Sequence, residues 1–218
     1  MNKKQQSVLF GAALVCLILF AILTVAVLTL DVDSIGPQES SIGLSSLNSK
    51  MRDAIPYNAF LYELTEILGL LALMSAVVFA LIGGIQLIKG RSLKAVDKDI
   101  YLLAVLYVVT LASYLFFETF VVNYRPVIAS GGELEASFPS SHTLLAVTFI
   151  GSAMYQTLRR VKRVAVKYSV FSAGGVLMTL SVIGRFLCGV HWFTDILGGL
   201  LLGGAILFAY VGACEKIV

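Results

Sequence analysis

The sequence predicts an all-α membrane protein: a single domain of residues 1–218 in which six transmembrane helices form a bundle. Hydrophobic residues make up 58% of the chain and charged residues 13%, and the mean hydropathy is +0.91. A soluble core of this size does not need so many apolar runs that are each long enough to cross a bilayer. The basic residues lie in short loops without a recognisable binding module, so we expect no nucleic-acid partner.

The predicted spans are the apolar runs at residues 8–30, 67–88, 100–122, 142–158, 168–187 and 192–211. The first run is longer than a signal-peptide core and lacks a small-residue cleavage site, so we expect it to be retained. The long polar segment 31–63 is serine-rich and then amphipathic. It fits either an interfacial helix or lid, or a solvated loop.

The distribution of basic residues predicts the orientation. Six spans place both termini on one side, and that side holds twelve of the sixteen Lys and Arg residues. The positive-inside rule makes this side cytoplasmic. The polar stretches 123–141 and 185–195 are then both expected on the extracytoplasmic face of the cell membrane.

The stretch 184–195 carries an arginine, a histidine and an aspartate between two apolar runs. Charged groups at membrane depth are costly and usually functional. If the chain is helical from His191, Asp195 lies on the same helix face and can accept a proton from one imidazole nitrogen, which leaves the other free to attack. Arg185 could bind the attacked anion. A snorkelling arginine beside an interfacial histidine and a helix cap explains this stretch alone equally well.

The stretch 138–142 reads Phe-Pro-Ser-Ser-His, and Asn-Tyr-Arg-Pro precedes it at 123–126. Pro139 disfavours helix before it, and Ser140 or Ser141 is a natural N-cap, so we expect free backbone N–H groups at the start of the fourth span. Such a helix end can bind phosphate, with His142 on its first turn. An ordinary helix cap is the alternative.

Together the two stretches point to phosphoryl chemistry. The chain's two histidines each lie beside groups that bind anions, on the same predicted face. One imidazole can attack phosphorus while the other protonates the leaving oxygen. Two histidines with one carboxylate could hold zinc, but two arginines in the same pocket argue against a cation, so we expect neither metal nor cofactor.

Residues 118–195 resemble the type 2 phosphatidic acid phosphatase (PAP2) superfamily. That family has three motifs: Lys, six residues, Arg-Pro; then Pro-Ser-Gly-His; then Ser-Arg, five residues, His, three residues, Asp. The matching positions here are Arg125 and Pro126; Pro139, Ser140 and His142; and Arg185, His191 and Asp195. Ser141 stands in place of the second motif's glycine, and Gly184 in place of the third motif's serine.

The resemblance implies a metal-independent phosphatase that acts on a membrane lipid, either a phosphomonoester or a pyrophosphate. Its site would lie at the outer membrane–water boundary, and its substrate would be of the undecaprenyl pyrophosphate or phosphatidylglycerophosphate type. His191 would be the nucleophile, Asp195 its orienting carboxylate and His142 the general acid. The groups implied to hold the phosphoryl oxygens are Arg125, Arg185, Ser140 and Ser141. A phosphotransferase using the same phosphohistidine fits these residues equally well.

Glu118 departs from the resemblance, because it occupies the place of the first motif's lysine, seven residues before Arg125. A carboxylate repels phosphate, so Glu118 either holds Arg125 from the same helix face or contacts a neutral or cationic part of the substrate. Tyr124 is a further candidate for a specificity or structural role. Lys50 or Arg52 could supply the missing positive charge. The alternative function is a catalytically weakened protein of this fold that binds lipid phosphate.

Overall fold

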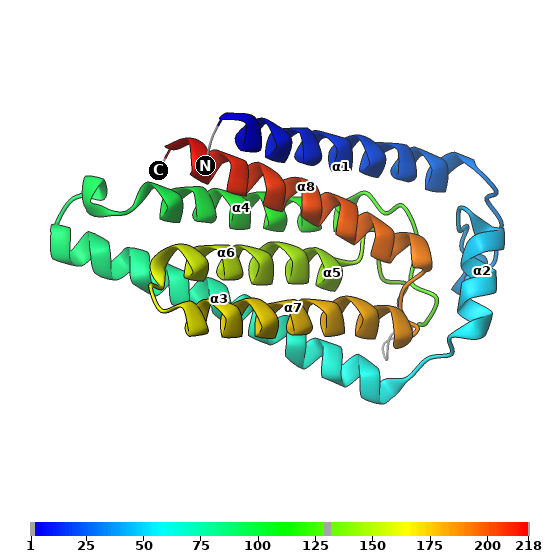
Figure 1. Cartoon of the computed structure of the whole chain (residues 1–218). Helices are drawn as coiled ribbons and strands as arrows, with labels where there is room; N and C mark the ends of the chain where they lie inside the picture. The colour runs from blue at the N-terminus through cyan, green and yellow to red at the C-terminus, as the bar shows by residue number, and fades with distance from the viewer. Residues whose placement is uncertain (1–2, 129–131, 218) are drawn as a thin grey trace.

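The computed structural model describes residues 3–128 and 132–217, which form a bundle of long helices with one short helix across an end (Figure 1). Residues 129–131 of the predicted polar connection, and the chain ends, lie outside the described residues. The helical segments are α1 (Lys3–Thr29), η1 (Pro37–Glu39), α2 (Ser45–Ala54), α3 (Ala59–Gly90), η2 (Leu93–Ala95), α4 (Lys98–Thr119), α5 (Ser141–Leu145), η3 (Ala146–Ile150), α6 (Gly151–Arg160), α7 (Val164–Leu187) and α8 (Phe193–Ile217).

Five of these helices, α1, α3, α4, α7 and α8, are long and apolar enough to cross a membrane, which makes the chain a multi-pass membrane protein. The predicted fourth span corresponds to α5, η3 and α6, which follow one another without a loop. The π-helical turns of η3 divide it, although the residues at its ends keep right-handed helical dihedrals. Residues 141–160 therefore form one helical rod with a local change of hydrogen-bond register.

The second helix begins earlier than hydropathy indicates. We expected the span to start at residue 67, but α3 starts at Ala59 because the Asn58 side chain accepts a hydrogen bond from Leu61 N at 3.0 Å. The turns that this cap adds contain polar residues, which a hydropathy average excludes. Their side chains contribute directly to the site described below. The fifth and sixth predicted spans are also extended, to Val164 at the start of α7 and Ile217 at the end of α8.

Helix α8 is the most buried of the long helices, and α1 packs antiparallel along it, so the two ends of the chain lie together (Figure 1). On the other side of α8, the close approach of the start of α5 depends on Gly199. A Cβ atom there would lie 2.8 Å from both the Ser140 carbonyl oxygen and the Thr143 Cβ. The first turn of α8 therefore packs directly against the start of α5, and Ser140 N donates to the Asp195 carbonyl at 2.9 Å.

Residues 31–63 contain a helix, α2, so this segment is not a plain loop. Helix α2 lies across the end of the bundle (Figure 1), and Asn48 attaches it to α8. The buried Asn48 side chain donates to Gly43 O at 2.8 Å and to Thr194 Oγ1 at 3.0 Å, and it accepts from Thr194 N at 3.3 Å. These bonds hold α2 beside the first turn of α8.

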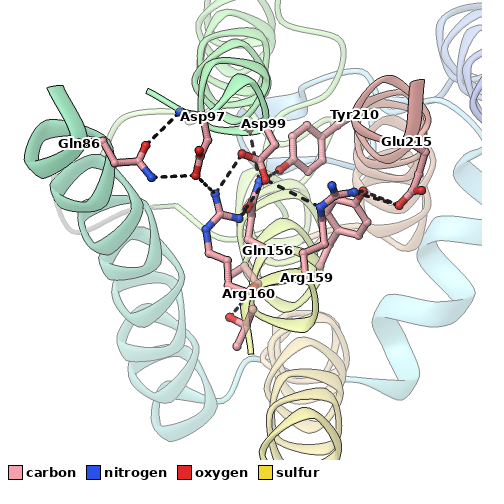
Figure 2. A network of polar contacts seen from close by, with 11 residues as sticks. Gln86, Asp97, Asp99, Gln156, Arg159, Arg160, Tyr210 and Glu215 are labelled. Atoms are coloured by element: carbon pink, nitrogen blue, oxygen red, sulfur yellow. Dashed lines mark hydrogen bonds and ion pairs between the residues drawn. The ribbon is translucent and has the colours of Figure 1, made fainter. Parts of the chain in front are cut away.

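A polar network ties the opposite end of the bundle together (Figure 2). Arg160 of α6 binds the nearly buried Asp99 of α4 with two bonds of 3.0 Å, one to each carboxylate oxygen. Next to it, Arg159 pairs with Glu215 of α8 at 3.2 Å. Through Gln86 of α3, which binds Asp97, the network connects four helices far from the histidines, so the two unusual polar regions lie at opposite ends of the molecule.

Candidate active site

The two histidines and their predicted partners meet at the α2 end of the bundle. His142 comes from α5, Arg185 from the last turn of α7, His191 from the α7–α8 turn, Asp195 from α8 and Arg125 from the connection after α4. Both guanidiniums lie close enough to both imidazoles to act on them electrostatically. The structure thus brings together residues that the sequence places as far apart as 125 and 195.

His191 is held by two polar neighbours on its Nδ1 side. Asp195 Oδ2 lies 3.5 Å from Nδ1, which is long for a hydrogen bond, whereas Ser137 Oγ lies at 3.2 Å. Ser137 also donates a hydrogen bond to Asp195 Oδ2, and Trp192 N donates to the same oxygen at 2.8 Å. Ser137 therefore bridges the imidazole and the carboxylate, which fixes the ring and leaves Nε2 as the free nitrogen.

Two features of this pair differ from expectation. Helix α8 begins at Phe193, so His191 precedes the helix, and the contact with Asp195 arises across the helix start. The turn before it needs Gly189, whose φ of +74° is unfavourable for other residues. The sequence reasoning missed Ser137, because a serine just before Phe138 carries no signal of its own.

The protonation state of His191 follows from burial. The residue is only 4% exposed, and Nε2 has no hydrogen-bond partner among residues 3–128 and 132–217. Burial, and then the charges of Arg125 and Arg185, holds the pKa of His191 well below its usual 6.5. The imidazole is therefore neutral at physiological pH, which is the form that can act as a nucleophile.

Arg185 is fully buried at the end of α7, with one side bound and the other open. Its NH1 lies 2.9 Å from Glu66 Oε1 and donates to Thr65 Oγ1 at 3.0 Å, and its guanidinium carbon lies 5.0 Å from the centre of the Tyr62 ring. Nε and NH2 have no partner within the part of the chain that the structure describes. This pair of N–H groups is the edge of a guanidinium that binds two oxygens of a phosphate.

Arg125 lies in the connection after α4, where Glu135 holds it. Its NH1 is 2.7 Å from Glu135 Oε2, and its backbone N donates to Glu135 O at 3.0 Å. The proposed helical pairing with Glu118 is wrong, because α4 ends at Thr119 and the two residues no longer share a helix face. Tyr124, beside it, accepts a hydrogen bond at its carbonyl from Trp192 Nε1 at 2.7 Å, so its backbone fastens this connection to the α7–α8 turn.

The start of α5 matches the predicted cap. Ser140 is the N-cap residue, and its Oγ accepts from Thr143 N at 3.4 Å, which leaves the hydroxyl proton free to be donated. Ser141, partly exposed, lines a small hollow of about 10 Å³ with His191, Glu118 and Tyr114. The hollow has room for about one water molecule. Glu118 therefore lies at the edge of the space beside His191.

His142 contacts a residue that the sequence analysis missed. Its Nε2 lies 3.2 Å from Glu66 Oε2, while Nδ1 is buried and without a partner in the described ranges. Glu66 lies between the polar segment 31–63 and the predicted second span, and the sequence analysis gave it no role. The available signal was the cap at Asn58, which extends α3 back through Glu66. The same carboxylate contacts Arg185, so it bridges two of the predicted site residues.

The two basic residues of α2, Lys50 and Arg52, are peripheral to the site. Arg52 borders a second small hollow next to His191, but its NH1 donates to Ile55 O at 3.2 Å, at the end of its own helix. Lys50 is exposed on α2. Neither residue takes the place of the first motif's lysine in this structure.

Comparisons with known proteins agree with this site. The PAP2 superfamily matches residues 100–216, more than half of the chain, and this range contains all three motifs. Lipid phosphate phosphatase delta of Arabidopsis thaliana is 33% identical over 86 residues, which cover 38% of this chain and 21% of that protein. Phosphatidylglycerophosphatase B of Bacillus subtilis is 35% identical over 86 residues, which cover 39% of this chain and 42% of that protein.

The fold also matches a solved structure along its whole length. The crystal structure of a transmembrane PAP2-type phosphatidylglycerolphosphate phosphatase from Bacillus subtilis aligns with a TM-score of 0.69 at 22% identity, and covers 95% of this chain and 98% of that one. The curated relatives match over less than half of their own length. The family match, the fold and the three motifs together show that this multi-pass membrane protein belongs to the PAP2 superfamily.

Proposed function

We propose that the chain is a metal-independent lipid phosphatase that works through a phosphohistidine. The observation that carries this proposal is the pairing of two unsatisfied buried groups: Nε2 of the neutral His191, and the Nε–NH2 edge of Arg185. A phosphoryl group bound by that edge satisfies the arginine and presents phosphorus to the imidazole. The unpartnered Nε of Arg125 adds a second guanidinium N–H that favours an anion.

The reaction has two steps. His191 Nε2 attacks phosphorus as the bond to the leaving oxygen breaks, and protonated His142 gives that oxygen its proton. Water then attacks phosphorus, His142 takes up the proton of the water, and the P–N bond breaks to release phosphate. Arg185, Arg125 and the hydroxyl and backbone groups of Ser140 and Ser141 stabilise the charge on the phosphoryl oxygens. Asp195 and Ser137 hold His191 in the tautomer that attacks.

We place the site on the extracytoplasmic face and both termini in the cytoplasm. In this topology residues 141–160, the fourth span in chain order, cross the membrane together with the five long helices. The support is the excess of Lys and Arg at the other end of the bundle. Labelling intact cells with a membrane-impermeant thiol reagent checks this orientation. A cysteine introduced at the exposed Lys50 should react, whereas one at Lys94 should not; the reverse pattern would invert the topology.

The substrate is a lipid phosphomonoester or pyrophosphate. The names of the Bacillus subtilis relative and of the solved structure make phosphatidylglycerophosphate the first compound to test. Undecaprenyl pyrophosphate is the second, on the strength of the family resemblance. Glu118 borders the hollow beside His191, so it is placed to act on the part of the substrate next to the phosphate.

Phosphate release from these lipids in detergent, with EDTA present, tests the function. Release by the wild type and its loss in His191→Ala are expected, with a fall of about 10⁴-fold or more when the nucleophile is removed. Glu118→Lys should change the preference between lipids. If the wild type releases no phosphate from any lipid while Glu118→Lys gains activity, the protein is instead a lipid-phosphate-binding relative of the enzymes.

A further inference from the structure

One face of α3 contacts both His142 and Arg185. This face is formed by Tyr62, Thr65, Glu66 and Gly69, whose spacing of three, four and seven residues places them side by side on a helix. It lies outside the residues 100–216 that match the family, and none of the three motifs includes it. The face therefore adds to the site something that the motifs do not describe.

The Glu66 carboxylate is the centre of this face. Its Oε1 lies 2.9 Å from Arg185 NH1, and its Oε2 lies 3.2 Å from His142 Nε2. The two partners come from α7 and α5, so a single carboxylate fixes the distance between them. The Glu66 side chain is 39% exposed, which places it at the rim of the site.

Two other contacts show that α3 is shaped to receive these partners. A Cβ atom on Gly69 would lie 2.8 Å from His142 Cδ2 and 3.1 Å from Nε2, so the imidazole rests directly on the α3 backbone. One turn earlier, Thr65 accepts from Arg185 NH1 at 3.0 Å, and the Tyr62 ring lies against the same guanidinium. The helix face thus holds one edge of each partner and leaves the other edge open.

The atoms that α3 leaves without a partner are the ones that the proposed reaction uses. With Nε2 on Glu66, His142 keeps Nδ1 without a partner, and with NH1 on Glu66 and Thr65, Arg185 keeps Nε and NH2. Ser137 and Asp195 leave His191 in the same condition, bound at Nδ1 and open at Nε2. Each imidazole therefore has its own carboxylate.

We propose that Glu66 is a positioning residue for the leaving-group side of the reaction: it holds His142 so that the Nδ1 proton is delivered to the leaving oxygen, and it braces Arg185 against α3. The inference rests on the proposed phosphatase function. When the P–O bond breaks, the Nδ1 proton moves to the leaving oxygen, and the Nε2 proton stays on the imidazole, hydrogen-bonded to Glu66. In the second step Nδ1 receives the proton of the attacking water.

This role predicts a dependence on the leaving group that a purely structural role does not. A poor leaving group, such as the alkoxide of a long-chain alkyl phosphate, needs a positioned acid. A good one, such as the nitrophenolate of 4-nitrophenyl phosphate, needs it much less. Glu66→Gln keeps the size and hydrogen-bonding capacity of the side chain but removes its charge. Glu63→Gln, on an exposed position one turn away on α3, is the matched control.

We expect Glu66→Gln to lower kcat/KM for the alkyl phosphate by about 10²-fold and kcat/KM for 4-nitrophenyl phosphate by less than about tenfold, since general-acid assistance is worth that much and kcat/KM does not include the second step that both substrates share. Glu63→Gln should match the wild type on both. Equal losses on the two substrates, or no loss, would overturn the inference. A gain in activity or a lower KM would also overturn it, because Glu66 would then be an anion that competes with substrate for Arg185.

Gly69→Ala tests the same inference without touching a charge. The added methyl should displace the His142 ring and cause the same loss, greater for the alkyl phosphate than for the aryl phosphate. Gly84→Ala is the control, since a Cβ atom there meets nothing within 4 Å. If Gly69→Ala turns over both substrates at the same rates as Gly84→Ala, contact with α3 does not position His142 for the reaction. If the wild type itself releases no phosphate, the proposed function fails as well, a result distinct from the equal losses above.

Discussion

His191 and His142 lie at the same end of the bundle, and their neighbours differ. His191 is almost completely buried and shares Asp195 with Ser137, whereas His142 lies on the partly exposed Glu66. Burial and two nearby guanidiniums disfavour a proton on His191. In the proposed mechanism, the division between nucleophile and acid therefore rests on the side chains that contact each ring.

The protonation of His191 can be measured directly, because the chain has only two histidines. In His142→Gln, side-chain ¹⁵N NMR should show a neutral imidazole at pH 6.5, because burial, Arg125 and Arg185 lower the pKa of His191 well below that value. The unfolded chain binds a proton on this residue below about pH 6.5, so this site should destabilise the fold as the pH falls further. An imidazolium signal at pH 6.5 or above would contradict the assignment.

At the scale of elements, α2 and α3 support the site although neither carries a motif. Helix α3 contacts His142 and Arg185 through Glu66, and α2 lies across the end of the bundle next to the α7–α8 turn. The attachment of α2 to α8 depends on Asn48, which bonds to Thr194, 146 residues away in the sequence. Because Thr194 is adjacent to Asp195, movement of α2 should also shift Asp195, which contacts His191.

Asn48→Ala should loosen α2. The change removes three hydrogen bonds and leaves buried groups of Gly43 and Thr194 unpaired, at a cost of about 1–3 kcal/mol. Hydrogen exchange, followed by mass spectrometry in detergent, should become faster in residues 45–54 and at the start of α8. Lys50→Ala, on an exposed position of the same helix, should exchange like the wild type. Unchanged protection in Asn48→Ala would mean that apolar packing holds α2 without this side chain.

For the whole molecule, the bundle separates chemistry from stability. The histidines lie at the α2 end, and the network around Asp99 lies at the other (Figures 1 and 2). That network contains no histidine and is built from ion pairs among α4, α6 and α8. Its separation from the site means that changes there should affect unfolding and leave catalysis unchanged.

Asp99→Asn and Asp97→Asn form a matched pair for this prediction. Both carboxylates contact Arg160, but Asp99 is nearly buried, whereas the Asp97 side chain is 55% exposed. Thermal unfolding in detergent should show a loss of about 1–3 kcal/mol for Asp99→Asn and about 0.2–1 kcal/mol for Asp97→Asn. Phosphate release per folded molecule should be the same in both. Equal stabilities, or a selective loss of turnover, would contradict this separation.

The sequence by itself was enough to predict the fold class and the family. Long apolar runs record which segments can cross a bilayer, and the spacing of Arg185, His191 and Asp195 is a local property that survives in the sequence. The cap at Ser140 was predictable for the same reason, because it depends on residues next to one another. The spacing argument was wrong where the helix ended, since α4 stops before Arg125 can share a face with Glu118.

Only the tertiary structure decided which groups serve the two histidines. Ser137 reaches His191 across 54 residues, and Glu66 reaches His142 across 76. A serine in a loop and a glutamate at a helix start are ordinary in sequence, and their roles arise from the packing of α3, α5, α7 and α8 against one another. Hydropathy and motif spacing describe residues that are neighbours along the chain. A site is formed by residues that are neighbours in space, and close helix packing determines which residues these are.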